Sequence, residues 1–379
     1  MSHGRTAPSA RLLVDARKAF DSGIGTYVRS VLPRVLKLLG GDIAVRVLVA
    51  RGDLAKHHAL GVGLGGAVEF VELGEAPLSV AEQVAFRRVL GRRDCFWATS
   101  LAHPLFTRTA MVATVHDVAQ LALPGAAAGG AWVRRGARLY FASLRRAASA
   151  LLFDSAYTQS QFHRHVGPSD APESVVALGV EPVWFEAGAT PAPAPGVRPY
   201  LVCVGNLRPH KNLRLLISAF AAVQDRMPHE LVLIGKASGF RTGDPGLQQA
   251  LAALGARARW LGDIGDAELR AWVAGADAMV LPSLHEGFGL PALEAMAAGC
   301  PVLASDIGAH VEVCADAVRY FDPQSSSALG DLLLAQASLA PAARAAWRAR
   351  GRQRARQFSW DETAARTAAA LDRLVRSAR

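Results

Sequence analysis

Short apolar segments alternate with amphipathic ones along the C-terminal half of this chain, and that alternation restricts the fold more than any other feature. Segments that are apolar throughout are typical of strands buried on both faces, as in a parallel sheet covered by helices. The alternation therefore predicts consecutive βαβ units and an α/β domain. The expected strands are 200–206, 230–237, 278–283 and 301–305, and the expected helices are 213–223, 266–276 and 291–299.

The N-terminal half has a similar but less regular pattern, with expected strands at 11–16, 44–50, 68–73, 111–116 and 150–155. A chain of 379 residues is long enough for two domains. The Ala-, Pro- and Gly-rich segment 187–199 indicates the linker between them. We expect two Rossmann-like, doubly wound domains, 1–186 and 200–358, with a central cleft at the carboxyl ends of their strands. The last segment, 359–379, is expected to be a helix with Ser359 as N-cap that packs back on the N-terminal domain.

Positive charge is concentrated in the N-terminal half. Residues 1–185 contain 21 Lys and Arg against 14 Asp and Glu, a balance of +7 within the +10 of the whole chain. Four arginine pairs contribute to it: Arg87-Arg88, Arg92-Arg93, Arg134-Arg135 and Arg145-Arg146. Such pairs suit an anionic membrane surface or an acidic acceptor, and solvated helix faces are the alternative. Nucleic acid is not expected as a partner, because no recognised binding motif accompanies the charge.

Other features indicate a cytoplasmic protein. The chain contains no run of about 18 apolar residues, so no transmembrane helix is predicted. The first twenty residues lack the apolar stretch of a signal peptide. The four cysteines are widely spaced and include no CxxC pair, which favours free thiols over zinc ligands or a disulfide framework. With the basic N-terminal half, these features place the protein in the cytoplasm, with peripheral docking on the inner face of the cytoplasmic membrane as a further expectation.

The segment EGFGLPALE, residues 286–294, carries the clearest functional signal. Gly287 and Gly289 lie between the end of a strand and a helix expected to start at Pro291. Glycines allow close approach of the backbone to a ligand, and a helix N-terminus favours anions such as a diphosphate. Glu286 before the loop and Glu294, expected in the first helical turn, can both face the same site. By itself this pattern is also compatible with an ordinary loop and helix cap.

A second segment, GNLRPHKNL at 205–213, places Arg208 and Lys211 at the carboxyl end of the first strand of the same domain. Two cations there can neutralise a pyrophosphate and stabilise it as a leaving group. Cations are disfavoured at a helix N-terminus, so an anionic partner is expected.

Together these segments resemble glycosyltransferase family 4, retaining enzymes of the GT-B architecture. The resemblance is strongest over residues 200–323, where it includes YLVCVGNLRPHKNL, the long run from WLGDIGD to SDIGA, and AVRYFDP. In the N-terminal half it covers the shorter segments DSGIGTYVRSVLP, TVHDVAQLALPG and LLFDSAYTQSQF.

The resemblance implies roles for individual residues. Arg208 and Lys211 would bind the donor diphosphate, Glu294 the ribose hydroxyls, and Glu286 the hydroxyls of the transferred sugar. His116 would reach the reacting sugar, which makes His116, Glu286, Lys211 and Arg208 the expected catalytic group. Further donor contacts are expected from Gly23, Gly25, Gly205, Ile264, Gly287, Phe288, Gly289 and Leu290. For His116 the alternative is a polar residue that ends a strand.

The implied reaction is the transfer of a hexose, with retention, from a nucleotide-diphosphate sugar to a glycan hydroxyl. GDP-mannose is the favoured donor, and the acceptor belongs to a bacterial surface polysaccharide or a lipid-diphosphate-linked oligosaccharide. No Asp-x-Asp motif occurs, so we expect neither a metal nor a cofactor. The alternatives are a rhamnosyl- or other hexosyltransferase that uses a dTDP- or UDP-sugar, a sugar-nucleotide epimerase, and an inactive binding module. An NAD-dependent oxidoreductase is disfavoured because no G-x-G-x-x-G follows an expected strand.

Overall fold

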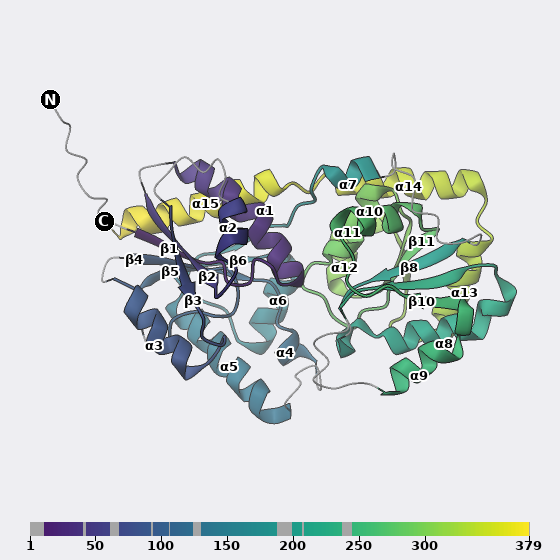
Figure 1. Ribbon diagram of the computed structural model, residues 1–379, viewed down its shortest axis with the longest axis horizontal. Helices are drawn as coiled ribbons and strands as arrows, with labels where there is room; N and C mark the ends of the chain where they lie inside the picture. Colours follow the sequence, from purple (N-terminus) through teal and green to yellow (C-terminus); the bar gives the residue numbers. More distant parts are fainter. Residues whose placement is uncertain are drawn as a thin grey trace. The chain divides into compact units, whose positions relative to one another are not determined.

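The computed structural model describes residues 11–40, 43–60, 68–91, 94–105, 107–123, 130–187, 199–206, 208–236 and 245–378. The chain divides into two compact units, each built on one parallel sheet (Figure 1). Unit 1 comprises residues 1–121, 134–179 and 360–379, and unit 2 comprises 122–133 and 180–359. The expected linker 187–199 lies almost wholly outside the described residues, as does the arginine pair Arg92-Arg93.

Unit 1 contains a seven-stranded sheet with the order β3-β2-β1-β4-β5-β6-β7. Its strands are β1 (Arg11–Asp15), β2 (Ala44–Ala50), β3 (Val68–Leu73), β4 (Asp94–Ala98), β5 (Ala110–Val115), β6 (Ala150–Phe153) and β7 (Glu173–Val175). Its helices are α1 (Ser22–Leu39), α2 (Leu54–Leu60), α3 (Val80–Val89), α6 (Ala156–His165) and α15 (Trp360–Ser377), with α4 (Ala119–Ala122) and α5 (Gly130–Ala147) at the boundary between the units. Every strand pair is parallel, because each connection crosses over through a helix or loop on one face.

Unit 2 contains a six-stranded parallel sheet with the order β10-β9-β8-β11-β12-β13. Its strands are β8 (Tyr200–Val204), β9 (Glu230–Ile234), β10 (Ala258–Trp260), β11 (Ala278–Leu281), β12 (Val302–Ser305) and β13 (Arg319–Phe321). Its helices are α7 (Val183–Glu186), α8 (Leu213–Val223), α9 (Pro245–Ala253), α10 (Asp266–Gly275), α11 (Leu290–Ala298), α12 (Gly308–Cys314), α13 (Ser326–Ala337) and α14 (Pro341–Ala355). The four central strands β9, β8, β11 and β12 are almost entirely buried, as the uninterrupted apolar segments predict, whereas the edge strands β10 and β13 are mostly half-buried.

The strand order reverses direction in both sheets, so right-handed crossovers place helices on both faces. In unit 2 the helices α8 and α9 cover one face and α10, α11 and α12 the other; α13 packs on α8, and α14 on α11 (Figure 1). This is the doubly wound arrangement expected from the sequence, and such sheets bind ligands at the carboxyl ends of their strands.

The last helix, α15, returns to unit 1 and packs along α1, as the sequence analysis expects. Thr363 donates a hydrogen bond to the carbonyl of Ala177 at 2.7 Å, and Trp360 lies near Tyr27, with the ring centroids 6.4 Å apart. Residues separated by more than 300 positions therefore share one hydrophobic layer.

Two short-range expectations need correction. Gly23 and Gly25, which the family resemblance assigns to a glycine loop near the donor phosphates, lie instead in the first turn of α1, which begins at Ser22. The helix expected from Pro291 begins one residue earlier, at Leu290, so no acidic residue lies in its first turn and Glu294 follows that turn. Proline is accepted near the start of a helix because its missing N–H would have no partner there. A proline therefore predicts the first helical residue only to within one position.

Candidate functional site

The carboxyl ends of β8 and β9 meet at two glycines. Gly205 and Gly235 adopt φ of +153° and +152°, and a Cβ atom on Gly235 would overlap the carbonyl oxygen of Gly205. Only glycine allows so close an approach of two chains with this conformation. The edge of the sheet beside Lys211 is therefore formed by bare backbone, and the Lys211 side chain passes within 3.6 Å of the Cβ position of Gly205.

Lys211 and Glu286 form an ion pair above this edge. Lys211 ends a short 3-10 turn after β8, and Glu286 lies in the loop between β11 and α11. Their Nζ and Oε1 atoms are 2.6 Å apart, and both side chains are largely buried, at 18% and 14% exposure. Within the protein, the anionic partner of Lys211 is thus Glu286, the glutamate predicted to bind the sugar.

A chain of hydrogen bonds connects Glu286 to the core of unit 2. Ser283 donates to Oε1 of Glu286 at 2.6 Å, Ser305 donates to the carbonyl of Ser283 at 2.6 Å, and Nδ1 of His310 donates to the carbonyl of Ser305 at 3.0 Å. Burial opposes ionisation of Glu286, but the charge of Lys211, the influence of His310 and the bonds from Lys211 and Ser283 lower its pKa to about 2. Glu286 is therefore a carboxylate at neutral pH and can accept hydrogen bonds but not donate a proton.

The N-terminus of α11 lies directly after this loop. Gly289 precedes the helix with φ of +102°, and a Cβ there would approach Cδ2 of His310 at 3.2 Å. His310 is buried and its pKa is lowered by burial, partly offset by the negative charge of Glu286. The helix thus presents its positive end beside the Glu286 carboxylate, with a neutral imidazole underneath.

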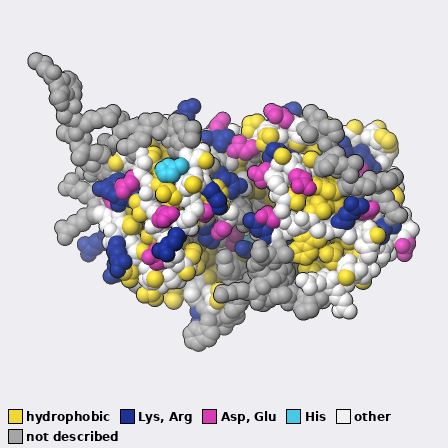
Figure 2. All heavy atoms as spheres, viewed as in Figure 1, with side chains coloured by type: hydrophobic (Ala, Val, Ile, Leu, Met, Phe, Trp, Pro, Cys, Tyr) yellow, Lys and Arg dark blue, Asp and Glu magenta, His cyan; other side chains and the backbone are white. Residues whose placement is uncertain are grey.

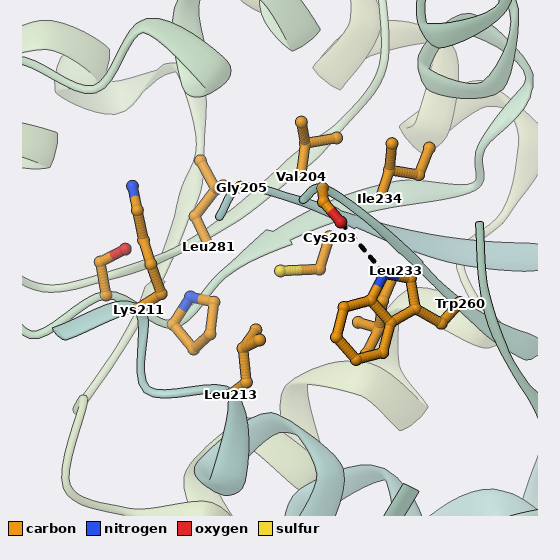
Figure 3. Close-up of a pocket in the computed structure, with 12 residues that line it drawn as sticks. Cys203, Val204, Gly205, Lys211, Leu213, Leu233, Ile234, Trp260 and Leu281 are labelled. Atoms are coloured by element: carbon orange, nitrogen blue, oxygen red, sulfur yellow. Dashed lines mark hydrogen bonds between the residues drawn. The ribbon is translucent and has the colours of Figure 1, made fainter. Parts of the chain in front are cut away.

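A pocket opens on the same edge, lined mainly by apolar side chains from β8, β9 and β11 (Figure 3). Lys211 and Trp260 lie on opposite sides of it, and Nε1 of Trp260 donates to the carbonyl of Gly235 at 3.0 Å. Cys203 also lines the pocket, and burial raises the pKa of its thiol to about 12 despite the nearby Lys211 charge. The Cys203 thiol is thus protonated at neutral pH, and it lines the pocket as an apolar group and not as a nucleophile.

The other expected donor contacts of unit 2 differ in how far they are buried. Arg208 follows β8 with an exposed side chain, and Ile264 is half-buried in the loop before α10. Glu294 is half-buried on α11. Phe288 is buried and packs edge-on against Phe358, with the ring centroids 5.8 Å apart, so its side chain serves the packing of unit 2.

The expected residues of unit 1 are His116, which follows β5, and Gly23 and Gly25 in the first turn of α1. Nδ1 of His116 lies 2.6 Å from Asp154, and Nε2 lies 2.8 Å from the carbonyl of Thr99. Burial opposes protonation of His116, yet the Asp154 carboxylate raises its pKa. Both ring nitrogens are engaged by the protein, which is the arrangement of a polar residue that ends a strand. On α1, Gly25 lies close to the backbone of Ala19, and a Cβ would meet that carbonyl at 2.7 Å.

Ser283, Ser305 and Asp154 were not identified from the sequence. Serines and aspartates follow many strands in this chain, and no spacing marks these three. Their position could have indicated them, because each lies at the end of an expected strand, where polar side chains collect in a parallel sheet.

Residues 198–336, which include all of this unit 2 site, match the family model described as glycosyl transferases group 1. The chain is 35% identical over 173 residues to O-antigen chain mannosyltransferase B of Escherichia coli, covering 44% of each chain. It is 32% identical over 240 residues to an MMP alpha-(1->4)-mannosyltransferase of Mycolicibacterium hassiacum, covering 60% of this chain and 52% of that one. The chain thus spans about half the length of these curated relatives.

The fold is that of GT-B glycosyltransferases. HepE of Anabaena, solved in complex with UDP and glucose, superimposes with a TM-score of 0.75 at 17% identity over 96% of this chain and 99% of that one. The expected α/β class with two Rossmann-like domains is confirmed.

Proposed function

We propose that this chain is a retaining glycosyltransferase, which moves a hexose from a nucleotide-diphosphate sugar to a hydroxyl of a glycan acceptor. The observation that carries the proposal is the Lys211–Glu286 pair beside the N-terminus of α11, within the segment that matches the glycosyl transferases group 1 family. A cation, a carboxylate of low pKa and a positive helix end supply what a leaving diphosphate and a sugar require.

In the proposed reaction the bond between the anomeric carbon and the diphosphate oxygen breaks, and the acceptor oxygen bonds to that carbon on the same face. The acceptor hydroxyl proton passes to the departing phosphate. Lys211 and Arg208 neutralise the diphosphate, and the first turn of α11 adds the positive end of its dipole. Glu286, held ionised, accepts hydrogen bonds from the sugar hydroxyls, and Glu294 accepts those of the ribose.

The donor in this proposal is GDP-mannose, and the acceptor is a bacterial surface polysaccharide or a lipid-diphosphate-linked oligosaccharide. The support is the similarity to two mannosyltransferases, at 35% and 32% identity. The base would lie against main-chain groups near Ile264 and the pocket wall at Gly235. A dTDP- or UDP-sugar is the alternative donor within the same activity.

Isothermal titration with GDP, UDP and dTDP tests the donor. GDP should bind at least tenfold more tightly than the others, a difference of about 1.4 kcal/mol. Tighter binding of UDP or dTDP would overturn the mannose assignment and leave the transferase assignment intact.

Incubation with the nucleotide sugar alone tests the reaction class. A transferase should hydrolyse the donor slowly and convert it rapidly only with a glycan acceptor, whereas an epimerase interconverts the sugar without one. We propose that no divalent metal takes part, so EDTA should leave the rate unchanged, and full loss with recovery on adding Mg²⁺ would contradict this.

A further inference from the structure

Two helices of unit 1, α3 and α5, form one continuous outer surface. The connections from β3 to β4 and from β5 to β6 run in the same direction along the sheet, so right-handed crossovers place both helices on the same face. Gln83 of α3 donates to the hydroxyl of Tyr140 on α5 at 3.5 Å, and Figure 1 shows the helices side by side. We call this the α3–α5 surface and define it by Leu78, Val80, Val84, Arg87, Arg88, Arg138, Leu139 and Arg146.

Large apolar side chains are unusually exposed there. Val80 is 83% exposed and Leu139 is 72% exposed, and Leu78 and Val84 are also exposed. These are four of the nine exposed large hydrophobic residues in the described part of the chain. Single exposed apolar residues are ordinary, but a group of them on adjacent helices indicates an interaction surface.

The same surface carries arginines whose positive charge no exposed acidic residue of α3 or α5 neutralises. Arg87, Arg88, Arg138 and Arg146 are exposed, and none of them forms an ion pair with another described residue. The sequence of α5 contains no acidic residue, and the one acidic residue of α3, Glu82, is buried against Arg17 at 2.7 Å. Figure 2 shows dark-blue and yellow side chains, with some magenta ones among them, over the region that Figure 1 labels α3.

Arginine content alone does not produce such a surface, as α14 of unit 2 demonstrates. That helix is also rich in arginine, but its guanidinium groups form ion pairs and hydrogen bonds within unit 2. Arg344 pairs with Asp277, and Arg354 donates to the carbonyls of Val313 and Glu312 at 2.8 Å, at the end of α12. On α3 and α5 no comparable use of the four exposed arginines exists among the described residues.

We propose that the α3–α5 surface docks the protein on an anionic lipid bilayer, with the arginines on head-group phosphates and the Val and Leu side chains in the interfacial layer. This goes beyond the proposed transfer reaction and does not depend on it. Nucleic acid would satisfy the arginines but not the aliphatic side chains. None of the exposed large hydrophobics in the described residues is aromatic, so no platform for base stacking accompanies the charge.

Flotation of the full chain with vesicles tests the proposal. The protein should float at low salt with an equal mixture of phosphatidylcholine and phosphatidylglycerol, and stay behind with phosphatidylcholine alone. In Arg87→Gln/Arg138→Gln, partition should fall about 25-fold, or roughly fivefold per arginine near the surface. In Val80→Ser/Leu139→Ser it should fall by roughly tenfold because two apolar side chains leave the interface.

Matched controls come from the opposite face of the same sheet. Arg366→Gln/Arg373→Gln removes two exposed charges from α15, and Leu38→Ser removes an exposed apolar side chain from α1. Both controls should float like the wild type, which supports the α3–α5 surface. Equal flotation with neutral vesicles, or equal losses in the controls, would overturn the proposal. Loss in the arginine variant with none in the Val80→Ser/Leu139→Ser variant would overturn it in favour of a soluble polyanion.

Discussion

The carboxyl edges of the two sheets carry charged groups in opposite ways. In unit 2, Lys211 and Glu286 are bound to each other with part of each side chain exposed, and Lys211 passes beside the backbone of Gly205. In unit 1, Arg17 is buried between Asp15 and Glu82, at 2.6 and 2.7 Å, with the ring of Phe86 beneath its guanidinium group.

We expect the charged groups at the edge of unit 2 to be able to change partner, and those at the edge of unit 1 to be unable to do so. In the proposed function a donor diphosphate competes with Glu286 for Lys211, and both side chains of the pair remain partly exposed, at 18% and 14%. The side chains of the Arg17 cluster are buried, so their charges hold the β1–α1 connection in place. We expect mutations at the two edges to affect different observables.

The largest effect should come from Arg17→Met. It leaves two buried carboxylates, Asp15 and Glu82, without their cation, and loss of one member of a buried ionic group costs about 3–5 kcal/mol. Urea unfolding should show this loss while the affinity for a nucleoside diphosphate changes less than twofold. The control Arg226→Met, at an exposed position, should cost less than about 1 kcal/mol. A weakened nucleotide affinity in folded Arg17→Met would show that the two edges are not independent.

The next effect concerns turnover. Glu286→Ala should lower kcat about 100-fold, or about 2.7 kcal/mol, and alter donor affinity little, because contacts to the sugar strengthen in the transition state. Lys211→Ala and Glu294→Ala should instead weaken donor binding at least tenfold, since phosphate and ribose contacts exist in the ground state. Steady-state kinetics and titration calorimetry separate the two. Wild-type rates in a Glu286→Ala/Lys211→Ala double variant would disprove the site.

In both units the sequence predicted the longer apolar strands and missed others, and the reasons are physical. In unit 2 it missed β10 and β13, each three residues long and only partly buried. Strands β8 and β11 are buried on both faces and read as continuous apolar segments. In unit 1 the fully buried strand β4 was not predicted, because its segment begins with Asp94 and contains Cys95 and Trp97. Strand β7 was not predicted either, because it is three residues long and half-buried throughout.

The candidate site could be predicted in position but not in its internal contacts. Arg208, Lys211, Glu286 and Glu294 were assigned to one edge of one sheet from motif order alone. That Lys211 and Glu286 would bind each other could not be read from positions 75 residues apart. It depends on how the β11–α11 loop turns, which the serine at 283 and the φ of Gly289 decide.

A smaller effect should follow from His116→Ala. The variant loses the bonds to Asp154 and Thr99 and leaves a buried carboxylate, which should destabilise unit 1 by about 2 kcal/mol. If the role of His116 is structural, kcat of the folded variant should remain within a fewfold of wild type, and Asp154→Asn should behave in the same way. A loss of kcat in His116→Ala that Asp154→Asn does not share would instead support contact of His116 with the sugar.

The smallest effect should appear in the titration of two buried histidines, His103 of unit 1 and His310 of unit 2. Burial lowers the pKa of His103 to about 4, and it lowers that of His310 against the opposing charge of Glu286. Because the unfolded state binds more protons between about pH 4 and 6.5, the contribution of His103 to stability is complete above that window. It is lost as the pH falls through it, by about 1.4 kcal/mol at about pH 5.5. Glu286→Gln removes the nearby carboxylate, so NMR titration should show the pKa of His310 falling further while that of His103 stays unchanged. An unaltered pKa of His310 would mean that the charge of Glu286 does not act on its surroundings. The charged groups at the carboxyl edge of unit 2 would then be as unable to change partner as those of unit 1.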